Sequence, residues 1–242
     1  MKIGIFAYNF EHKKTQEGLL NLFLNGYKPV CIFAQDWKML PYVNNGARVG
    51  LQGMKYSHPK IIAEKLNIEY INISHDDSKC SKIIKELNLD IGIILGSRIL
   101  KKKVIDSFNI GVINMHPAML PDNRGLDNIK WAILNNLPQG VTTHLISEKI
   151  DAGHIIDKKL VDVYLDDTLT EIMLRIQNKE QIMMIESLHK IEFVNYDSFP
   201  ELSYEKYNLK ITPELENLTL KKFDEYKKEY KSIVNNYNLY SI

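Results

Sequence analysis

The sequence predicts an α/β fold with a Rossmann-like, mostly parallel sheet, flanking helices and a short C-terminal extension. Short runs rich in Ile and Val alternate with amphipathic stretches of helix length through roughly the first 160 residues, which is typical of a parallel sheet wrapped by helices. A chain of 242 residues is also long enough for one large domain that buries roughly 70–75% of its unfolded surface. We expect a main domain over 1–200 and an extension over 201–242.

Apolar, β-branched runs bounded by turn residues predict the strands. They are expected at Lys2–Tyr8, Pro29–Ala34, Glu69–Ile73, Asp90–Leu95, Gly111–Met115, Val141–Ser147 and His154–Tyr164. Helices are expected at Gln16–Leu24, Pro59–Leu66, Ser78–Leu87, Lys101–Phe108 and Asp127–Asn135. The first four of these helices would close right-handed crossovers. The loop Tyr42–His58 either closes over a ligand or is an ordinary crossover.

Two further helices are expected after the sheet. The run Asp-Thr-Leu-Thr-Glu at 167–171 is an N-cap signal that opens a long helix to about Phe193. The last helix is expected near Thr219–Asn236. The apolar positions of the long helix are expected to face the core, and they are Leu169, Ile172, Met173, Ile176, Ile182, Met183, Ile185 and Leu188.

Bulk charge and cysteine usage exclude several classes of partner. The 31 Lys and Arg residues against 30 Asp and Glu residues give a net charge of +1, so no overall field favours nucleic acid or a membrane surface. Cys31 and Cys80 suit buried thiols better than a disulfide framework, which favours the cytoplasm. No apolar run approaches the ~20 residues of a membrane span, and the N-terminal run is too short for a signal peptide.

Asn114, His116 and Asp151 are the candidate catalytic residues, and no serine or cysteine nucleophile stands beside them. An amide, an imidazole and a carboxylate without a nucleophile indicate direct group transfer between two bound substrates. Acyl transfer to an amine needs a donor for the developing oxyanion and an acceptor for the proton that the amine loses. Asn114 and His116 share one face of a strand end and could both donate. Asp151 could hold a protonated His116 or accept the proton through water.

Structural roles are the alternative for each of these residues taken alone. A single histidine at a strand end is usually a structural residue, and an asparagine beside it is usually part of a turn. Several short motifs that follow one another in a fixed order along the chain reverse that expectation. The Asn-x-His pair is followed by Pro117, Leu120-Pro121 and Arg124-Gly125, and then by Ile-Asp-Ala-Gly at 150–153.

The segments at 112–125 and 140–156 resemble the folate-dependent formyltransferases, which act on methionyl-tRNA, glycinamide ribonucleotide or nucleotide sugars. The resemblance implies that Asn114, His116 and Asp151 form the catalytic triad of a formyltransferase catalytic domain. It also implies N10-formyltetrahydrofolate as the donor and no metal. The chain departs from the family where Ala118 replaces a frequent serine and Met119 a usual leucine. The resemblance places the donor against Arg98, Ile99, Leu100, Met119 and Asp151, and backbone groups would do much of the recognition.

The acceptor is inferred from what differs around the motif. Glycinamide ribonucleotide enzymes resemble one another in a Gly-Ser-Asn phosphate loop, and this chain has Ala-Tyr-Asn-Phe at 7–10. Methionyl-tRNA enzymes carry a C-terminal OB-like domain and a basic face, and neither is expected here. The chain is most similar to nucleotide-sugar N-formyltransferases that act on dTDP-4-amino-4,6-dideoxyhexoses, with an expected place in O-antigen lipopolysaccharide biosynthesis. Candidate substrate-binding residues are Tyr8, Asn9, Phe10, His12, Lys13, Arg124 and Asp127.

Alternative roles for single residues and alternative functions for the chain remain open. Arg124 could instead brace the turn through carbonyl groups, and Lys13 could simply begin a helix. A formyltetrahydrofolate hydrolase is less expected because such chains resemble ones with an N-terminal regulatory domain, and here the first strand begins at Lys2. A non-catalytic folate- or nucleotide-binding module has no use for the charge arrangement of the triad. A dehydrogenase is disfavoured because no Gly-x-Gly-x-x-Gly follows the first strand. A homodimer is left open.

Overall fold

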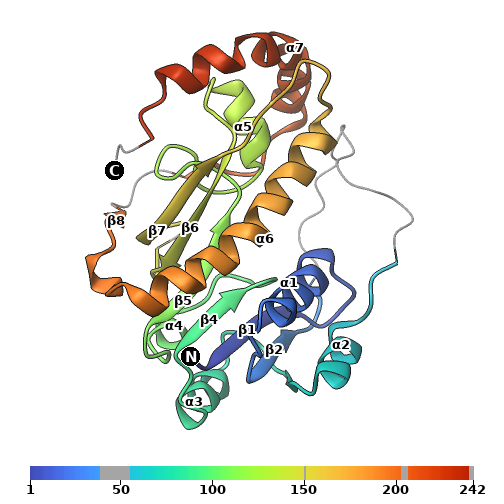
Figure 1. The fold of residues 1–242 in the computed structure, drawn as a ribbon. Coiled ribbons are helices and arrows are strands. Elements are labelled where there is room, and N and C mark those ends of the chain that lie inside the picture. The colour runs from blue at the N-terminus through green and yellow to red at the C-terminus, as the bar shows by residue number, and fades with distance from the viewer. Residues whose placement is uncertain (39–54, 150, 203–206, 240–242) are drawn as a thin grey trace.

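The computed structural model of the chain describes residues 1–38, 55–149, 151–202 and 207–239. Within these ranges the strands form one sheet in the order β3-β2-β1-β4-β5-β6-β7-β8 (Figure 1). The strands are β1 (Ile3–Tyr8), β2 (Cys31–Gln35), β3 (Glu69–Asn72), β4 (Ile91–Ile94), β5 (Gly111–His116), β6 (Gly140–Ile146), β7 (Gly153–Leu160) and β8 (Glu201–Leu202). The helices are α1 (Lys13–Leu24), α2 (Pro59–Leu66), α3 (Ser78–Glu86), α4 (Lys102–Ile105), α5 (Asn128–Leu134), α6 (Leu169–Phe193) and α7 (Pro213–Asn236).

The predicted fold class is confirmed. The first five strands pair in parallel, and β6, β7 and β8 continue the sheet in antiparallel pairing. Most of the predicted Tyr42–His58 loop lies outside the described residues. One strand was missed: β8 has only two residues, too few to show an alternating pattern.

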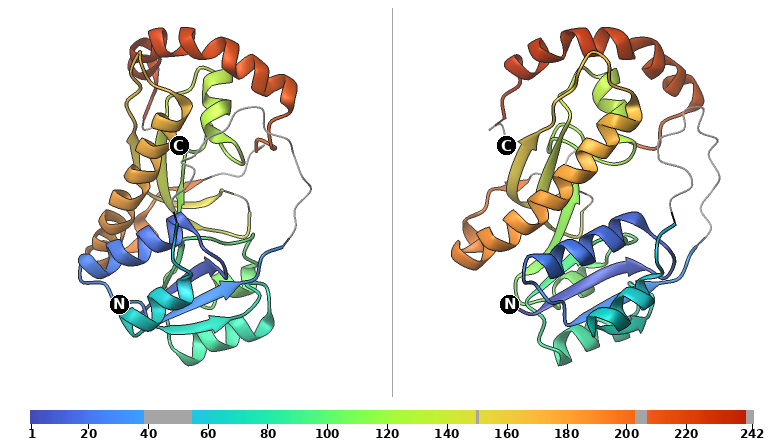
Figure 2. Two further views of the ribbon diagram at one scale, coloured as in Figure 1. Left: turned by 90° about the vertical axis from the view of Figure 1, so that its right-hand side faces the viewer. Right: turned by 45° about the vertical axis from the view of Figure 1, so that its right-hand side comes forward.

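Helices cover both faces of the parallel part of the sheet (Figure 2). Alternation along β1 explains this, because Ile3, Ile5 and Ala7 pack under α1, α2 and α6, while Phe6 packs under α3 and α4. The two apolar layers bury the strands on both sides, which accounts for their nearly continuous apolar sequences. The carboxyl ends of β1, β4 and β5 consequently reach one edge of the sheet, where ligands of open α/β folds bind.

Helix α6 begins with a capping box, as its sequence predicts. The Thr168 side chain accepts a hydrogen bond from the Glu171 amide, and the Glu171 side chain accepts one from the Thr168 amide. The helix then runs diagonally across β5, β6 and β7 (Figure 1). Ser187 on α6 donates to Thr143 on β6 at 2.8 Å, which ties the helix to the antiparallel strands.

Helix α7 packs against α5 at the far end of the molecule from β1. It begins at Pro213, one turn and a half before the predicted Thr219, because Thr212 caps it and proline occupies its first turn. Tyr226 and Tyr230 anchor the helix: their hydroxyls donate to the carbonyls of Leu137 and Val161 at 2.7 and 2.6 Å. Burial raises the pKa of both tyrosine hydroxyls, so both stay protonated as donors.

A buried ion pair joins the same two helices, with Lys130 on α5 contacting Glu216 on α7. Among the described residues, no helix is both long and apolar enough to cross a membrane.

Candidate active site

Strand β5 carries Asn114 and His116 to the carboxyl edge of the sheet. The strand pairs with β4 in parallel and with β6 antiparallel, so it lies where the sheet changes direction. Asn114 faces His144 across the β5–β6 pair, and His116 faces Thr142. Two residues apart on one strand, the two side chains point to the same face. The sequence therefore fixes their common direction through the strand period alone.

His116 and Asp151 meet at this edge. The Nδ1 atom of His116 lies 3.4 Å from Oδ1 of Asp151, and their side chains are 4% and 14% exposed. The other ring nitrogen, Nε2, is 2.8 Å from the carbonyl oxygen of Asn123. Asp151 and the Asn123 carbonyl are hydrogen-bond acceptors, and the Asn128 amide nitrogen also lies 3.2 Å from Nε2. These contacts hold the His116 ring between Asp151 and the segment that follows β5.

The Asp151 carboxylate is fixed by the chain segment that follows His116. Its Oδ2 atom accepts a hydrogen bond from the Gly125 amide at 2.7 Å, and its carbonyl oxygen accepts one from Arg124 Nη1 at 2.9 Å. Asp151 itself has a φ of 48°, in the left-handed region. Short carboxylates tolerate this region better than most side chains. The geometry leaves Oδ1 for His116.

His144 lies behind Asn114, and sequence reasoning did not single it out. The ring is fully buried, and its Nδ1 lies 3.3 Å from the carbonyl oxygen of Ala152. Burial, and then the neighbouring His116, lower the pKa of His144 to about 4, so the ring is neutral near pH 7. Because Ala152 offers only an acceptor, the ring proton belongs on Nδ1. Nε2 then accepts from the Asn114 amide nitrogen at 3.3 Å, which fixes which end of that amide faces His144.

Two cavities open on either side of Asn114. The first, which we call the Asp151 cavity, has a volume of about 200 Å³. Among the predicted donor-binding residues, the structure brings Arg98, Ile99, Leu100 and Asp151 to it. Met119 is not among its lining residues; this side chain is fully buried against Gly140. The lining residues are Ile94, Ser97, Arg98, Ile99, Leu100, Asn114, Ile146, Ser147, Glu148, Lys149 and Asp151.

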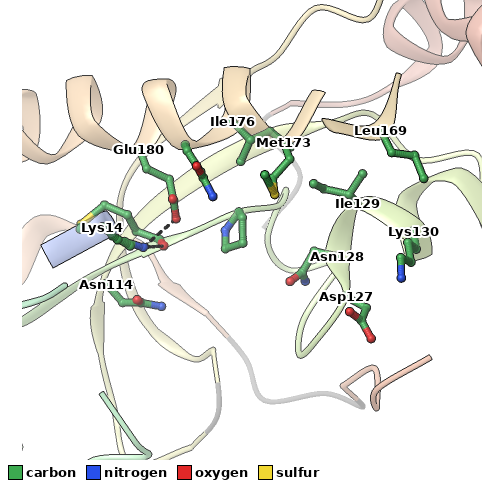
Figure 3. A pocket seen from close by; sticks show the side chains of 13 residues that line it. Lys14, Asn114, Asp127, Asn128, Ile129, Lys130, Leu169, Met173, Ile176 and Glu180 are labelled. Atoms are coloured by element: carbon green, nitrogen blue, oxygen red, sulfur yellow. Dashed lines mark hydrogen bonds and ion pairs between the residues drawn. The ribbon is translucent and has the colours of Figure 1, made fainter. Parts of the chain in front are cut away.

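The second cavity, which we call the Glu180 cavity, has a volume of about 480 Å³ and lies between β5, α5 and α6 (Figure 3). A salt bridge of 2.8 Å joins Lys14 on α1 to Glu180 on α6 at one end. The Lys14 ammonium also lies 3.4 Å from the Met115 carbonyl oxygen, beside Asn114. The lining residues are Lys14, Asn114, Met115, Pro117, Asp127, Asn128, Ile129, Lys130, Leu169, Met173, Ile176, Gln177 and Glu180.

The predicted substrate-binding residues divide between the Glu180 cavity and other positions. Asp127 lines the cavity, and its carboxylate accepts a hydrogen bond from the Ile211 amide. Arg124 lines neither cavity: it is 1% exposed and donates to the carbonyls of Pro121 and Asp151. Its placement agrees with the alternative that Arg124 braces the turn. Lys13 pairs with Glu17 along α1, and the next residue, Lys14, is the one that reaches the cavity.

The first loop is held by its own contacts. Tyr8 and Phe10 stack with ring centroids 4.9 Å apart, and the Tyr8 hydroxyl donates to the Ser97 carbonyl at 2.8 Å. Asn9 accepts from the Tyr70 hydroxyl, and His12 contacts Thr15 at 2.9 Å. Burial raises the pKa of Tyr8, and burial followed by Lys14 lowers that of His12. None of these loop residues lines either cavity in the described part of the chain.

Helix α6 contributes the cavity residues that the sequence analysis missed. Its predicted stripe of core residues includes Met173 and Ile176, and both in fact line the Glu180 cavity. Glu180 is the available signal, because a carboxylate interrupts an apolar stripe at helical spacing. Within the described ranges, no group of three His, Cys, Asp or Glu side chains is placed to hold a metal ion.

Comparison with known proteins adds an independent finding. A family model described as "Formyl transferase" matches residues 46–188, more than half of the chain. The methionyl-tRNA formyltransferase of Borreliella burgdorferi (strain ZS7) is 31% identical over 144 residues, covering 58% of this chain and 46% of that protein. The chain thus spans less than half the length of this curated relative.

Solved structures share the fold at low sequence identity. Phosphoribosylglycinamide formyltransferase from Anaplasma phagocytophilum superposes with a TM-score of 0.63 and 19% identity, covering 87% of this chain and 99% of that one. A sugar N-formyltransferase from Shewanella sp FDAARGOS_354 has a TM-score of 0.58 and 20% identity, covering 92% of this chain and 87% of that one. These similarities support the fold.

Proposed function

Because the chain belongs to the formyl transferase family, we propose that it transfers a formyl group from N10-formyltetrahydrofolate to the amine of a nucleotide-linked amino sugar. The observation that carries the proposal is the position of Asn114, which lines both the Asp151 cavity and the Glu180 cavity. A formyl group held in one cavity and an amine held in the other would meet at this side chain. Such positioning supports direct transfer without a protein nucleophile.

We place the pteridine ring of the folate donor at the Asp151 cavity. Ile94, Leu100 and Ile146 give it apolar walls, which suit the flat pteridine ring. Backbone groups at 98–100 and the Asp151 carboxylate supply polar partners for ring nitrogens. When bound, the donor supplies a formyl group on an activated nitrogen. Asp151 connects this cavity to His116, which supports placing the donor here rather than in the larger cavity.

Asn114 supplies the oxyanion donor. Negative charge develops on the formyl oxygen as the amine attacks, and an aligned amide N–H stabilises that charge. His144 accepts one hydrogen bond from the Asn114 amide nitrogen, and the amide nitrogen has a second hydrogen for the formyl oxygen. The His144 contact therefore orients Asn114 before any substrate arrives.

We assign charge stabilisation to His116 and proton transfer to Asp151. Asp151 and the Asn123 carbonyl hold the His116 ring beside Asn114, where a protonated ring would add positive charge. Asp151 lines the donor cavity together with Asn114, and it would accept the amine proton through water and return it to the nitrogen of the leaving tetrahydrofolate. The pair needs the Gly125 amide to keep Asp151 in place.

Two observations support an amino sugar as the acceptor. The lysines that line the Glu180 cavity are paired, Lys14 with Glu180 and Lys130 with Glu216, so the cavity suits a neutral, hydroxyl-bearing group better than a phosphate. The first loop packs the rings of Tyr8 and Phe10 where a glycine-rich phosphate loop would be needed. The Shewanella protein named as a sugar N-formyltransferase also has this fold. We take dTDP-4-amino-4,6-dideoxyglucose as the first acceptor to test, and the place in O-antigen biosynthesis stays a prediction.

The curated relatives favour a second candidate acceptor. They are named methionyl-tRNA formyltransferases, so the amine of methionyl-tRNA is the alternative. One experiment separates the candidates. The purified chain is incubated with N10-formyltetrahydrofolate and either the nucleotide amino sugar or methionyl-tRNA, and mass spectrometry is used to look for a product heavier by a formyl group.

We expect the sugar to gain the formyl group and methionyl-tRNA to remain unchanged. A formylated tRNA without a formylated sugar would move the function to the second candidate. Rapid loss of the donor's formyl group in the absence of any acceptor would indicate a hydrolase. No product with any nucleotide amino sugar would contradict the proposal.

A further inference from the structure

Asn128, the first residue of α5, connects the Glu180 cavity with His116. Its side chain lines the cavity, and Figure 3 shows it facing the same cavity as Asn114. Its Nδ2 atom lies 3.2 Å from Nε2 of His116. Asn128 is therefore in direct contact with one proposed catalytic residue and shares a cavity with another.

Asn123 fixes which end of the Asn128 amide faces the cavity. The Asn123 carbonyl oxygen lies 3.1 Å from Nδ2 of Asn128, and a carbonyl oxygen only accepts, so the atom that faces it is the nitrogen. In return, the Asn123 side chain donates to the Asn128 carbonyl at 2.8 Å. Asn208 holds Asn123 by donating to its Oδ1 at 3.1 Å. This network keeps Nδ2 of Asn128 beside Asn123 and His116, and Oδ1 is the polar atom left for the cavity.

The Oδ1 atom of Asn128 is an acceptor without a protein donor. Asn128 is 6% exposed, and its Oδ1 accepts no hydrogen bond from the part of the chain that the structure describes. Asn123, equally buried beside it, has both polar side-chain atoms bonded. Polar side-chain atoms at buried positions almost always have a partner. An exception in a cavity wall indicates that a bound molecule supplies the donor.

The attacking amine has the donor that this atom lacks. A primary amine attacks through its lone pair, so both of its N–H groups must point away from the formyl carbon. An acceptor for one N–H fixes the direction of the lone pair, and the other N–H is left for the water that leads to Asp151. An uncharged acceptor suits this task, because a carboxylate would favour the unreactive ammonium form of the amine.

We propose that Oδ1 of Asn128 accepts a hydrogen bond from the attacking amine and orients its lone pair towards the formyl carbon. This role rests on the proposed function and adds the residue that positions the nucleophile. The Asn128 amide exchanges no proton. The new C–N bond forms, the amine proton leaves through water to Asp151, and it then protonates the tetrahydrofolate nitrogen as the bond from that nitrogen to the formyl carbon breaks. Asn123 and Asn208 keep Asn128 in place.

Asn128→Asp tests the need for an uncharged acceptor. The variant keeps an oxygen at this position and adds a negative charge, which stabilises the ammonium form of the bound acceptor. With dTDP-4-amino-4,6-dideoxyglucose, the acid limb of the kcat–pH profile should move to higher pH by about one unit or more. Asn135→Asp, at the exposed C-terminal end of the same helix, is the matched control and should keep the wild-type profile.

The two limbs of the profile distinguish the amine from His116. A new carboxylate beside His116 would also favour protonation of that ring, which would move the alkaline limb. A shift of the alkaline limb alone, or an unchanged profile, would therefore overturn the proposed role. The other charged side chains that line the cavity are the same in both variants, and they are Lys14, Asp127, Lys130 and Glu180.

An acceptor without its amine tests the contact by binding alone. Titration calorimetry without donor, at about pH 9 where most of the amine is neutral, compares dTDP-4-amino-4,6-dideoxyglucose with dTDP-4,6-dideoxyglucose. The wild type should bind the second compound about threefold to tenfold more weakly, and this difference should disappear in Asn128→Leu because the partner is already gone. Asn135→Leu should retain the difference. A difference that persists undiminished in Asn128→Leu would contradict the contact.

Kinetics of Asn128→Leu separate this role from the proposed function. The variant should lower kcat about tenfold, since the lone pair is no longer oriented. Wild-type kinetics in a folded Asn128→Leu protein would overturn the role of Asn128 and leave the proposed function standing. Binding that depends on both the amine and Asn128, without any formyl transfer in the wild type, would uphold the contact and contradict the proposed function. Absence of both binding and transfer would contradict both.

Discussion

Asn114 lines both cavities, so replacing this side chain tests the proposed mechanism most directly. We expect Asn114→Ala to lower kcat by about 10²–10³-fold, because one oxyanion donor is worth roughly 3–4 kcal/mol in the transition state. KM should change little, since the contact strengthens only as charge develops. Steady-state kinetics measure both constants. Asn109→Ala, on the exposed turn before β5, is the control and should keep wild-type kinetics.

His144 makes stability depend on pH. Burial and the neighbouring His116 lower its pKa to about 4, below the ordinary value of 6.5. Between these two pH values the unfolded chain therefore binds a proton at His144 and the folded chain does not. The contribution of His144 to the unfolding free energy should therefore be fully present above pH 6.5. It should decrease as the pH falls towards 4 and change no further below pH 4. Between pH 7 and pH 5 the loss is about 2 kcal/mol.

Urea unfolding at the two pH values measures this loss in the wild type and in His144→Gln. The variant should lose about 2 kcal/mol less over the same interval, whatever its absolute stability. Comparing the two proteins is necessary because burial also lowers the pKa of His75, which acts in the same direction in both. Exposed His189→Gln serves as the control and should retain the wild-type pH dependence.

Sequence pattern predicted some site residues and not others for definite reasons. Asn114, His116 and Asp151 were found because the ordered set of short motifs around them resembles the folate-dependent formyltransferases. The catalytic roles of all three stay predictions. Gln177 was not found because the Glu180 carboxylate, which interrupts the apolar stripe of α6, is the one sequence signal that this turn faces a cavity. His144 was not found because its importance comes from the register with Asn114, which depends on how β6 returns beside β5.

The segment before α7 is hydrogen-bonded to the loop that follows His116, and we call this pair of backbone hydrogen bonds at Asn208 the clamp. The Asn208 amide donates to the Arg124 carbonyl at 2.9 Å, and the Leu126 amide donates to the Asn208 carbonyl at 3.0 Å. Gly125, between them, has a φ of 95°, and a Cβ added there would lie 2.1 Å from the Asn208 carbonyl oxygen. The same glycine's amide holds Asp151. The clamp therefore ties the C-terminal part of the chain to the candidate site.

Gly125→Ala should open the clamp. The added methyl group combines an unfavourable φ with a backbone clash, so we expect a loss of about 2 kcal/mol or more in unfolding free energy and a kcat reduced by at least tenfold. Gly26→Ala is the matched control, because Gly26 has a φ of 81° and nothing within 4 Å of its added Cβ. It should lose about 1 kcal/mol and keep its kcat. A Gly125→Ala protein with full activity would show that the clamp does not position Asp151.

The same elements show where sequence prediction of the fold succeeds. Strands β1, β2, β4 and β5 were predicted because they are almost entirely buried on both faces and are mostly apolar. The start of α7 was misplaced because its first turns are polar, and only its cap and proline mark the beginning. The clamp could not be predicted, since a backbone bridge between two irregular segments has no side-chain pattern.

The domain predicted over 1–200 and the extension predicted over 201–242 could unfold together or separately. That division stays a prediction. The buried Lys130–Glu216 pair and the hydroxyls of Tyr226 and Tyr230 cross it. Contacts of this kind couple the two parts, so we expect one cooperative unfolding transition.

The ion pair offers a direct test of that coupling. Lys130→Met removes the ammonium that pairs with the buried Glu216 carboxylate, which should cost about 3–5 kcal/mol. The double variant Lys130→Met/Glu216→Leu should recover most of this loss, because two apolar side chains replace both charges. Calorimetry gives both values and shows whether the transition stays single. Two separate transitions in the wild type would show that the extension folds independently.

The distance along the chain between Asp151 and the clamp has a consequence for synthesis on the ribosome. Asn114, His116 and Asp151 are all translated before Asn208. At about 5–20 residues per second, the nascent chain spends roughly 3–11 s between the last of these residues and its clamp. During that interval the sheet can form while the loop around Gly125 is still unrestrained. Newly made molecules should thus acquire their fold before they acquire activity.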